Sequence, residues 1–275
     1  MSNLMGDAIA QNVHKQNIMK DAFGWDIPVE SIPVPSAGLL YDPDSKLYKT
    51  ETLQIKAMTA HEEDILTSPA LLKEGTAVDY VIKSCLIDKT INVDNLIVGD
   101  KNAIMVSIRV TGYGRDYNIK PACDNCNKIN EITCDLSNLS IDRLKIEPIA
   151  PGRNEFEFIL PVTKKRVVFK FMTVKDQKER EAKQKFYEKK VTSGIRNTVT
   201  GFLEYSILAI EGITDKNKIH HFIRNMPAYD SKALRKHIID NEPGIDMSHE
   251  WECNYCQHEN DSVLLMTAEF FWPRI

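Results

Sequence analysis

Apolar and polar positions in the first third of the chain predict a strand followed by a helix. Leu53, Ile55 and Ala57 alternate with polar neighbours, a period of two residues that is typical of a half-buried strand. Thr59, with Glu62 three positions later, has the spacing of a capping box. We therefore expect a helix to begin directly after Thr59, and a second short helix after the glycine that breaks the pattern.

A longer apolar stripe predicts a third helix. Ile104, Ile108 and Thr111 fall on one helical face, and Asp100 stands before them where an N-cap residue is expected. Two glycines at 112 and 114 end the pattern. The first of two cysteine pairs should follow shortly after the end of this helix.

The second half of the chain predicts a hairpin and then helices. Aromatic and branched residues alternate over 156–171 around the sequence PVTKKR, which is typical of a β-hairpin. A strongly charged helix should follow, and then a helix over 197–212 that carries Leu203, Ile207 and Ile210 on one stripe. Two further short helices are expected before the second cysteine pair.

The two cysteine pairs belong to a repeated motif. CDNCNKINEIT (123–133) aligns without a gap with CNYCQHENDSV (253–263), and each reads Cys-x-x-Cys-x-x-x-Asn, an acid, and a strand-like stretch. Four thiolates at about 2.3 Å from one Zn²⁺ complete its tetrahedral shell. A complete shell leaves no position for a reacting water, so the expected metal is structural, with one Zn²⁺ per chain. The predicted ligands are Cys123, Cys126, Cys253 and Cys256.

The cysteines have other possible interpretations besides a metal site. The pairs could be buried, unmetallated thiols whose spacing arose by chance. A redox pair is disfavoured, because such pairs sit at helix N-termini and these precede strand-like stretches. Cys134 would have to displace a ligand, and His258 has a poor spacing for a filled site. Cys85 is most simply a small buried hydrophobe.

These elements predict an α+β protein, with a helical lobe and a small β-rich lobe that contains a split, zinc-ribbon-like four-cysteine site. Residues 1–30 read as an N-terminal arm, either disordered or an amphipathic helix. An α+β domain with the first cysteine knuckle is expected over 31–147, and a hairpin and helical insertion over 148–248. The second knuckle and a C-terminal strand, over 249–275, should complete the ribbon. Its closing FFWPRI is either core or a protein-contact surface.

Composition and charge exclude several classes of function. The formal net charge of −4 gives no general attraction to nucleic acid, and no apolar run is long enough to cross a bilayer. The N-terminus lacks the pattern of a signal peptide, so the chain is expected to be intracellular when it is made, and in a reducing compartment cysteines favour metal or free thiols over disulfides. No nucleotide-binding, metalloprotease or hydrolase motif is present, so we expect neither an enzyme nor a small-molecule substrate.

The order of the motifs resembles the base plate protein family of T-even-type contractile-tailed bacteriophages, which includes the baseplate hub subunit and hub assembly proteins. The similar stretches are VPSAGLLY (34–41), residues 55–68 and 97–117, the hairpin, and the second cysteine pair before FFWP. VPSAG stands where a leucine-first version is more usual. The family pattern carries over to Pro35, Ser36, Gly38, Tyr41, Thr59, Glu62, Glu63, Asp64, Asp100, Arg109, Tyr113 and Gly114.

The resemblance implies a structural or assembly role in the tail baseplate, at or near its central hub. Its partners would be other baseplate, hub and tail tube proteins, and a symmetric ring of this chain itself is one arrangement that it allows. The implied location is the virion tail, after synthesis in the host cytoplasm. The zinc site depends on the local spacing rather than on the family. The alternative is a zinc-ribbon nucleic-acid-binding protein, although the cysteine flanks hold few basic residues and the second is acidic.

Overall fold

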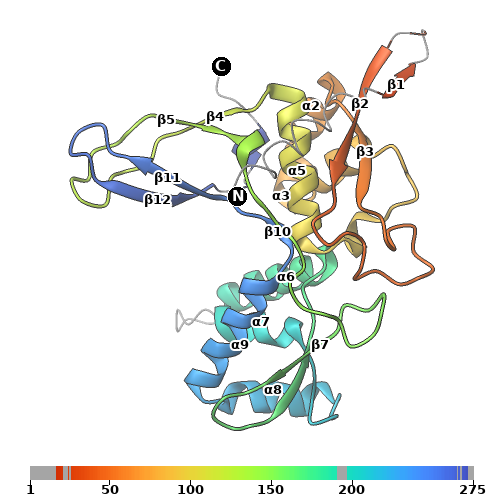
Figure 1. The fold of residues 1–275 in the computed structure, drawn as a ribbon, viewed down its shortest axis with the longest axis vertical. Coiled ribbons are helices and arrows are strands. Elements are labelled where there is room, and N and C mark those ends of the chain that lie inside the picture. The colour runs from red at the N-terminus through yellow and green to blue at the C-terminus, as the bar shows by residue number, and fades with distance from the viewer. Residues whose placement is uncertain are drawn as a thin grey trace, which may run out of the picture.

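The computed structural model describes residues 17–20, 24, 26–190, 197–264, 266 and 268–271. Within them it confirms an α+β protein with eight α-helices and several small antiparallel sheets. Figure 1 shows two helix-containing regions, one above the other, and a pair of long hairpins that project to one side. We call the two regions together the body, and the hairpins the clasp.

In the upper region of the body, helices α2 to α5 lie beside a three-stranded antiparallel sheet in the order β1-β2-β3. Figure 1 shows this sheet at the edge of the upper region. The central strand β2 pairs with β3 from Val29 opposite Lys56 to Pro33 opposite Thr52. Strand β2 begins at Asp26, inside the predicted N-terminal arm of residues 1–30. Residues 1–16 of that arm lie outside the described residues. The elements are β1 (Asn17–Lys20), β2 (Asp26–Pro33), β3 (Thr52–Lys56), α2 (Ala60–Thr67), α3 (Pro69–Glu74), α4 (Ala77–Cys85), the 3₁₀ turn η1 (Val93–Asn95) and α5 (Val98–Tyr113).

The lower region has its own three-stranded sheet, β7-β8-β9, and a further group of helices. The predicted hairpin is confirmed, with Phe156 opposite Phe169 and Phe158 opposite Val167. The charged helix is confirmed as α6. The elements are β7 (Phe156–Ile159), β8 (Arg166–Phe169), α6 (Val174–Lys190), α7 (Thr198–Ser206), β9 (Ile207–Ile210), α8 (Lys216–Asn225) and α9 (Ala228–Asn241).

The helix expected over 197–212 is wrong in its second half. Helix α7 ends at Ser206, and residues Ile207–Ile210 form strand β9. Ile207 pairs with Phe169, and Ile210 pairs with Val167 on strand β8. A stripe of branched residues is compatible with either a helix or a strand. Here residues 207–210 pair with β8 and form hydrogen bonds to backbone groups that would otherwise be unpaired at the edge of the sheet.

The clasp consists of two antiparallel hairpins, each of which carries one cysteine pair. A short ladder at its base joins β6 to β10, with Ile141 opposite Ile245. The division of the chain into the four predicted parts stays a prediction. The clasp and ladder elements are β4 (Asp116–Ile119), β5 (Ile132–Asp135), β6 (Ile141–Asp142), β10 (Gly244–Ile245), β11 (Ser248–Glu252) and β12 (Glu259–Val263), with 3₁₀ turns η2 (Leu136–Asn138) and η3 (Ala268–Phe271) nearby.

One continuous apolar core runs through both regions of the body. The predicted face of α5 is largely buried, with Ile104 and Ile108 almost without exposure. Phe270 and Phe271 of η3 are also fully buried in this core, so this part of the closing apolar stretch is core. Trp272 and the residues after it lie outside the described residues.

Asp100 does not cap helix α5, although its position before the apolar stripe predicts an N-cap. The helix begins at Val98, and Asp100 lies buried in its first turn. Its carboxylate accepts hydrogen bonds from the Ser36 backbone N–H (2.9 Å), the Ser36 hydroxyl (2.6 Å) and the Tyr41 hydroxyl (2.5 Å). Burial raises the pKa of Asp100, although these donors act to lower it. Asp100 therefore ties the loop after β2 to the central helix.

A second polar network confirms the predicted capping box. Glu62 accepts hydrogen bonds from the Thr59 backbone N–H (2.8 Å) and the Ser84 hydroxyl (2.5 Å), and its side chain is fully buried. It also forms an ion pair with Lys56 at 2.8 Å. Burial alone would raise the pKa of Glu62, but these partners lower it to about 2. One carboxylate thus joins β3, α2 and α4.

A third network surrounds the buried Arg109 of α5. Its guanidinium donates to the backbone carbonyls of Phe270 (3.0 Å), Gly114 (2.8 Å) and Asp116 (3.2 Å). These bonds fix the end of α5, the start of β4 and the C-terminal η3 turn relative to one another. The residues of the family resemblance thus include the centres of three structural networks.

Candidate metal centre

Two hairpins place the cysteine pairs at matching positions. The first pair lies in the turn between β4 and β5, and the second lies in the turn between β11 and β12. The ladders fix both turns, since Ile119 pairs with Ile132 and Glu252 pairs with Glu259. Figure 1 shows the two hairpins projecting together from the body. The cysteine-bearing ends of the hairpins thus meet far from the central helix in the fold.

The two cysteine turns have the same backbone conformation. The Cys123 N–H donates to the Lys128 carbonyl at 3.0 Å, and the Cys253 N–H donates to the His258 carbonyl at 2.9 Å. The residue after each pair adopts a positive φ, 56° in the first turn and 58° in the second. Such φ values let the chain reverse within one tight turn. The aligned halves of the sequence are therefore repeated in structure.

The four sulfurs form a compact group that crosses between the hairpins. Cys123 Sγ lies 3.7 Å from Cys256 Sγ, and Cys126 Sγ lies 3.7 Å from Cys253 Sγ. All four sulfurs lie within 4.8 Å of one another. Four sulfurs at about 2.3 Å from a tetrahedral ion would stand about 3.8 Å apart. The group therefore has the size and donor chemistry to hold one tetrahedral metal ion.

The thiols are free, and the surroundings of Cys123 and Cys253 favour their thiolate forms, whereas neighbouring groups raise the pKa of Cys126 to about 11. None of the four is in a disulfide; Cys123 and Cys253 are buried, and Cys126 and Cys256 are partly exposed. Burial alone would raise the pKa of Cys253, but hydrogen bonds from the backbone N–H groups of Tyr255 and Cys256 lower it to about 6. Backbone N–H groups also lower the pKa of Cys123 against the effect of burial. Metals bind the thiolate form, so these N–H groups prepare the site for a cation.

Two asparagines that sequence reasoning aligned, but gave no role, hold the hairpins together. Asn130 Oδ1 accepts from the backbone N–H of Asn254 at 2.9 Å, and Asn260 Oδ1 accepts from that of Asp124 at 3.0 Å. Each amide therefore reaches from one cysteine turn to the other. Both asparagines are buried, which makes these bonds costly to break. The signal in the sequence was their matching position after each cysteine pair.

Each of these side-chain amides also forms a hydrogen bond within its own turn. Asn130 Nδ2 donates to the Lys128 carbonyl at 3.0 Å, and Asn260 Nδ2 donates to the His258 carbonyl at 2.7 Å. Asn130 Nδ2 additionally lies 3.5 Å from Cys253 Sγ. Outer partners of this kind orient metal ligands and tune their basicity.

The remaining candidates from the sequence are not part of the sulfur group. Cys134 is buried in β5, and Cys85 is buried in α4, where burial raises its pKa to about 12. His258 contributes its backbone carbonyl, while its side chain is exposed. Among the described residues, the four cysteines form the one group of three or more metal-ligating side chains close enough to share an ion.

The clasp has only a small apolar cluster of its own. It contains Trp251, Cys123 and Cys253 as buried members, with Ile132 packed against them. The Trp251 indole donates to the Ser262 hydroxyl at 2.8 Å across the β11–β12 hairpin. A cluster of this size buries little area, so a bound ion would supply much of the stability of the clasp.

Comparison with known proteins gives one match. The family model described as T4 bacteriophage base plate protein matches residues 41–272, which is most of the chain. No curated protein and no solved structure matches. None of the helices that the structure describes combines the length and apolar character that a membrane span requires. The nucleic-acid-binding alternative gains no support from these findings.

Proposed function

Since the chain belongs to the T4 bacteriophage base plate protein family, we propose that it is a structural or assembly component of the central hub region of the tail baseplate. The family match over residues 41–272 is the observation that carries the proposal. The role consists of protein–protein contacts with neighbouring baseplate, hub and tail tube proteins. It requires no catalysis, and the polar networks centred on Asp100, Glu62 and Arg109 serve to hold the chain in one shape.

We also propose that the four-cysteine group holds one structural Zn²⁺. Sulfur separations of 3.7 Å across the clasp support the proposal, because they match the edge of a tetrahedral zinc–thiolate site. Cys123, Cys126, Cys253 and Cys256 would be the ligands. With all four positions taken by sulfur, the ion would join the two hairpins and would have no role in a reaction.

Tail particles and their assembly intermediates provide the test of the hub proposal. A tagged chain, supplied during infection by a phage that lacks its own copy, should co-purify with baseplate intermediates or with finished virions. A map of the tail tip should then place it next to the central hub. Absence from both intermediates and virions would overturn the proposal, and a position at the outer rim would overturn the hub assignment alone.

A further inference from the structure

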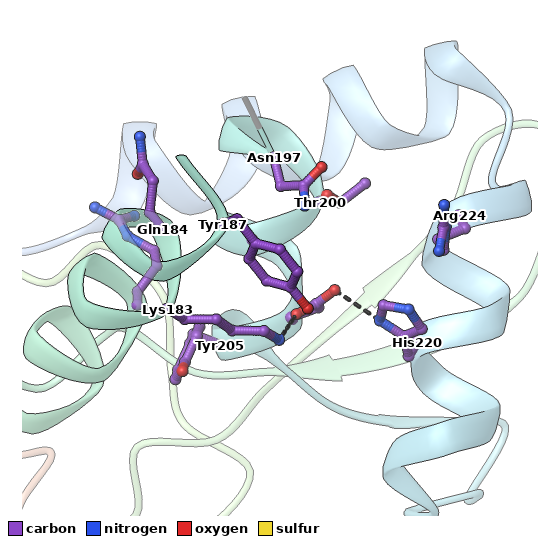
Figure 2. Close-up of a pocket in the computed structure, with 11 residues that line it drawn as sticks. Lys183, Gln184, Tyr187, Asn197, Thr200, Tyr205, His220 and Arg224 are labelled. Atoms are coloured by element: carbon purple, nitrogen blue, oxygen red, sulfur yellow. Dashed lines mark hydrogen bonds and ion pairs between the residues drawn. The ribbon is translucent and has the colours of Figure 1, made fainter. Parts of the chain in front are cut away.

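A pocket of about 310 Å³ lies between helices α6, α7 and α8, in the lower region of the body. Figure 2 shows side chains from all three helices facing it. Helix α6 contributes Arg180 and Lys183, and α8 contributes His220 and Arg224. None of the four cysteines lines the pocket, so it has no part in the metal centre.

The only carboxylate among the lining residues is already neutralised. Glu204 of α7 forms an ion pair with Lys183 at 2.6 Å, and its other oxygen lies 2.7 Å from His220 Nδ1 (Figure 2). By contrast, neither Arg180 nor Arg224 forms an ion pair within 4.0 Å with an acidic group of the described residues. Arg180 donates to Met172 Sδ at 3.7 Å and attracts Glu242 from a longer distance. The pocket lining therefore carries a net positive charge.

The rest of the lining suits a short peptide with carboxylate side chains. A guanidinium presents its N–H donors as a planar fork that fits a carboxylate. Asn197 and Thr200 add polar groups, and Tyr187 and Tyr205 offer ring surfaces to the apolar part of a bound segment. An extended nucleic acid fits less well, because the cations are gathered in one hollow and Glu204 lies among them.

We propose that this pocket binds an acidic peptide segment of another protein, with Arg180 and Arg224 as the carboxylate-binding residues. The identification of that protein as a tail component rests on the proposed function. The pocket would give the body a charge-selective contact that is separate from the clasp. Electrostatic contacts of this kind favour the correct partner and raise its rate of association.

The test is a binding titration with the full-length, zinc-loaded chain. The probe is a fluorescein-labelled octapeptide of alternating glutamate and alanine, followed by fluorescence anisotropy, and the matched peptide has glutamine in place of glutamate. We expect the glutamate peptide to bind at least tenfold more tightly than the glutamine peptide. Arg224→Glu should weaken its binding at least tenfold, and adding Arg180→Glu should abolish it. No binding of the glutamate peptide would overturn the proposal.

A matched double variant separates the pocket from general charge attraction. Lys175→Glu with Lys185→Glu changes the net charge as much as the pocket pair does. Both positions are exposed, lie outside the pocket and belong to α6, the helix that also carries Arg180. This double variant should change the affinity less than twofold. An equal loss in both double variants would overturn the proposal. Arg224 is exposed, so its variant should fold, and circular dichroism checks this.

A single-stranded thymidine octamer tests the other class of polyanion. Tighter binding of the octamer than of the peptide, lost in Arg224→Glu, would overturn the peptide assignment in favour of a nucleic-acid phosphate. These measurements use the isolated chain, whereas the hub proposal is tested in particles. Failure of the peptide to bind would therefore not contradict the proposal that the protein is part of the baseplate. Likewise, absence of the protein from tail particles would not contradict peptide binding by the pocket.

Discussion

In the body, buried side chains form one apolar cluster that extends from Ile32 in β2 to Phe271 in η3, whereas the clasp has a separate cluster built around Trp251 and two buried sulfurs. The body adds buried carboxylates and a guanidinium that bond to distant backbone groups. The clasp instead directs four thiols toward one another and crosses two amides between its turns. A bound ion would therefore matter far more to the clasp than to the body.

The difference follows from how much apolar surface each region can bury. A domain-sized core can hold its own shape, while a pair of isolated hairpins has too little buried area and needs a metal or a disulfide. The clasp also joins segments that lie 127 positions apart, from Cys126 to Cys253. Closing so long a loop costs conformational entropy, which a metal clip offsets. The two regions can therefore be separated experimentally by the interaction that each one needs.

Removal of one ligand should have the largest effect. In Cys253→Ser we expect loss of the bound zinc and loss of order in both hairpins, because zinc binding contributes on the order of 10 kcal/mol to small zinc-held structures. Elemental analysis should fall from about one zinc per chain to none. Amide hydrogen exchange should rise over 116–135 and 248–263, with little change in α5.

Cys134→Ala is the matched control for this change. Cys134 is also buried, but it lies in β5 outside the sulfur group and joins the body core. This variant should keep its zinc while it lowers the free energy of unfolding of the body. Full zinc content in Cys253→Ser, or a wild-type chain that binds no zinc, would contradict the metal assignment.

The sequence predicted the grouping of the four cysteines because its signals are local. Each cysteine turn is complete within a few residues, so CDNCNKINEIT and CNYCQHENDSV carry the whole pattern. The capping box of Thr59 and Glu62 is equally local and was also predicted. Helix and strand propensities are local as well, yet Ile207 was assigned wrongly, because the pairing partner β8 that decides its conformation lies elsewhere in the chain.

Long-range partners account for what could not be predicted. Asp100 looks like a cap when only its neighbours are considered, but its donors Ser36 and Tyr41 lie 64 and 59 positions away. The crossed bonds of Asn130 and Asn260 span 124 and 136 positions. Aligned asparagines suggest a shared role, but nothing in a single sequence shows that each one serves the opposite turn.

Asp100→Asn should have the next largest effect, and should act on the body. The amide keeps one oxygen but places two N–H donors among three existing donors, so buried donors lose their acceptor. We expect a loss of about 4 kcal/mol in the free energy of unfolding, measured by urea denaturation. The exposed Asp44→Asn should change it by less than about 0.5 kcal/mol. Zinc content should stay unchanged, and its loss would contradict the separation of the two regions.

Acid should weaken the Glu62 network within a defined pH window. The pKa of Glu62 is lowered from 4.5 to about 2 in the folded chain, so its contribution is complete above pH 4.5 and is lost as the pH falls toward 2. A shift of this size corresponds to roughly 3 kcal/mol for a buried carboxylate. The measurement is the difference in unfolding free energy between the wild type and Glu62→Gln. That difference should be constant from pH 5 to 7 and shrink below about 4.5; a difference that grows on acidification would contradict the assignment.

The smallest predicted effect concerns the crossed asparagines of the clasp. Asn260→Ala removes the acceptor of the Asp124 N–H, and Asn130→Ala removes that of the Asn254 N–H together with the contact to Cys253 Sγ. Partners of metal ligands typically contribute 10- to 100-fold in metal affinity, so we expect zinc loss to a chelator to speed up about tenfold in Asn260→Ala and somewhat more in Asn130→Ala.

The control and the double variant show whether the two amides act as one unit. Asn254→Ala should lose zinc at the wild-type rate, because the bond to Asn130 uses its backbone N–H rather than its side chain. Each amide bridges the same pair of turns, so loss of the first bond should loosen the geometry that the second requires. The double variant should therefore lose zinc more slowly than the product of the single effects predicts. Strictly multiplicative effects would show that the two crossed bonds act independently, and would contradict their action as one unit.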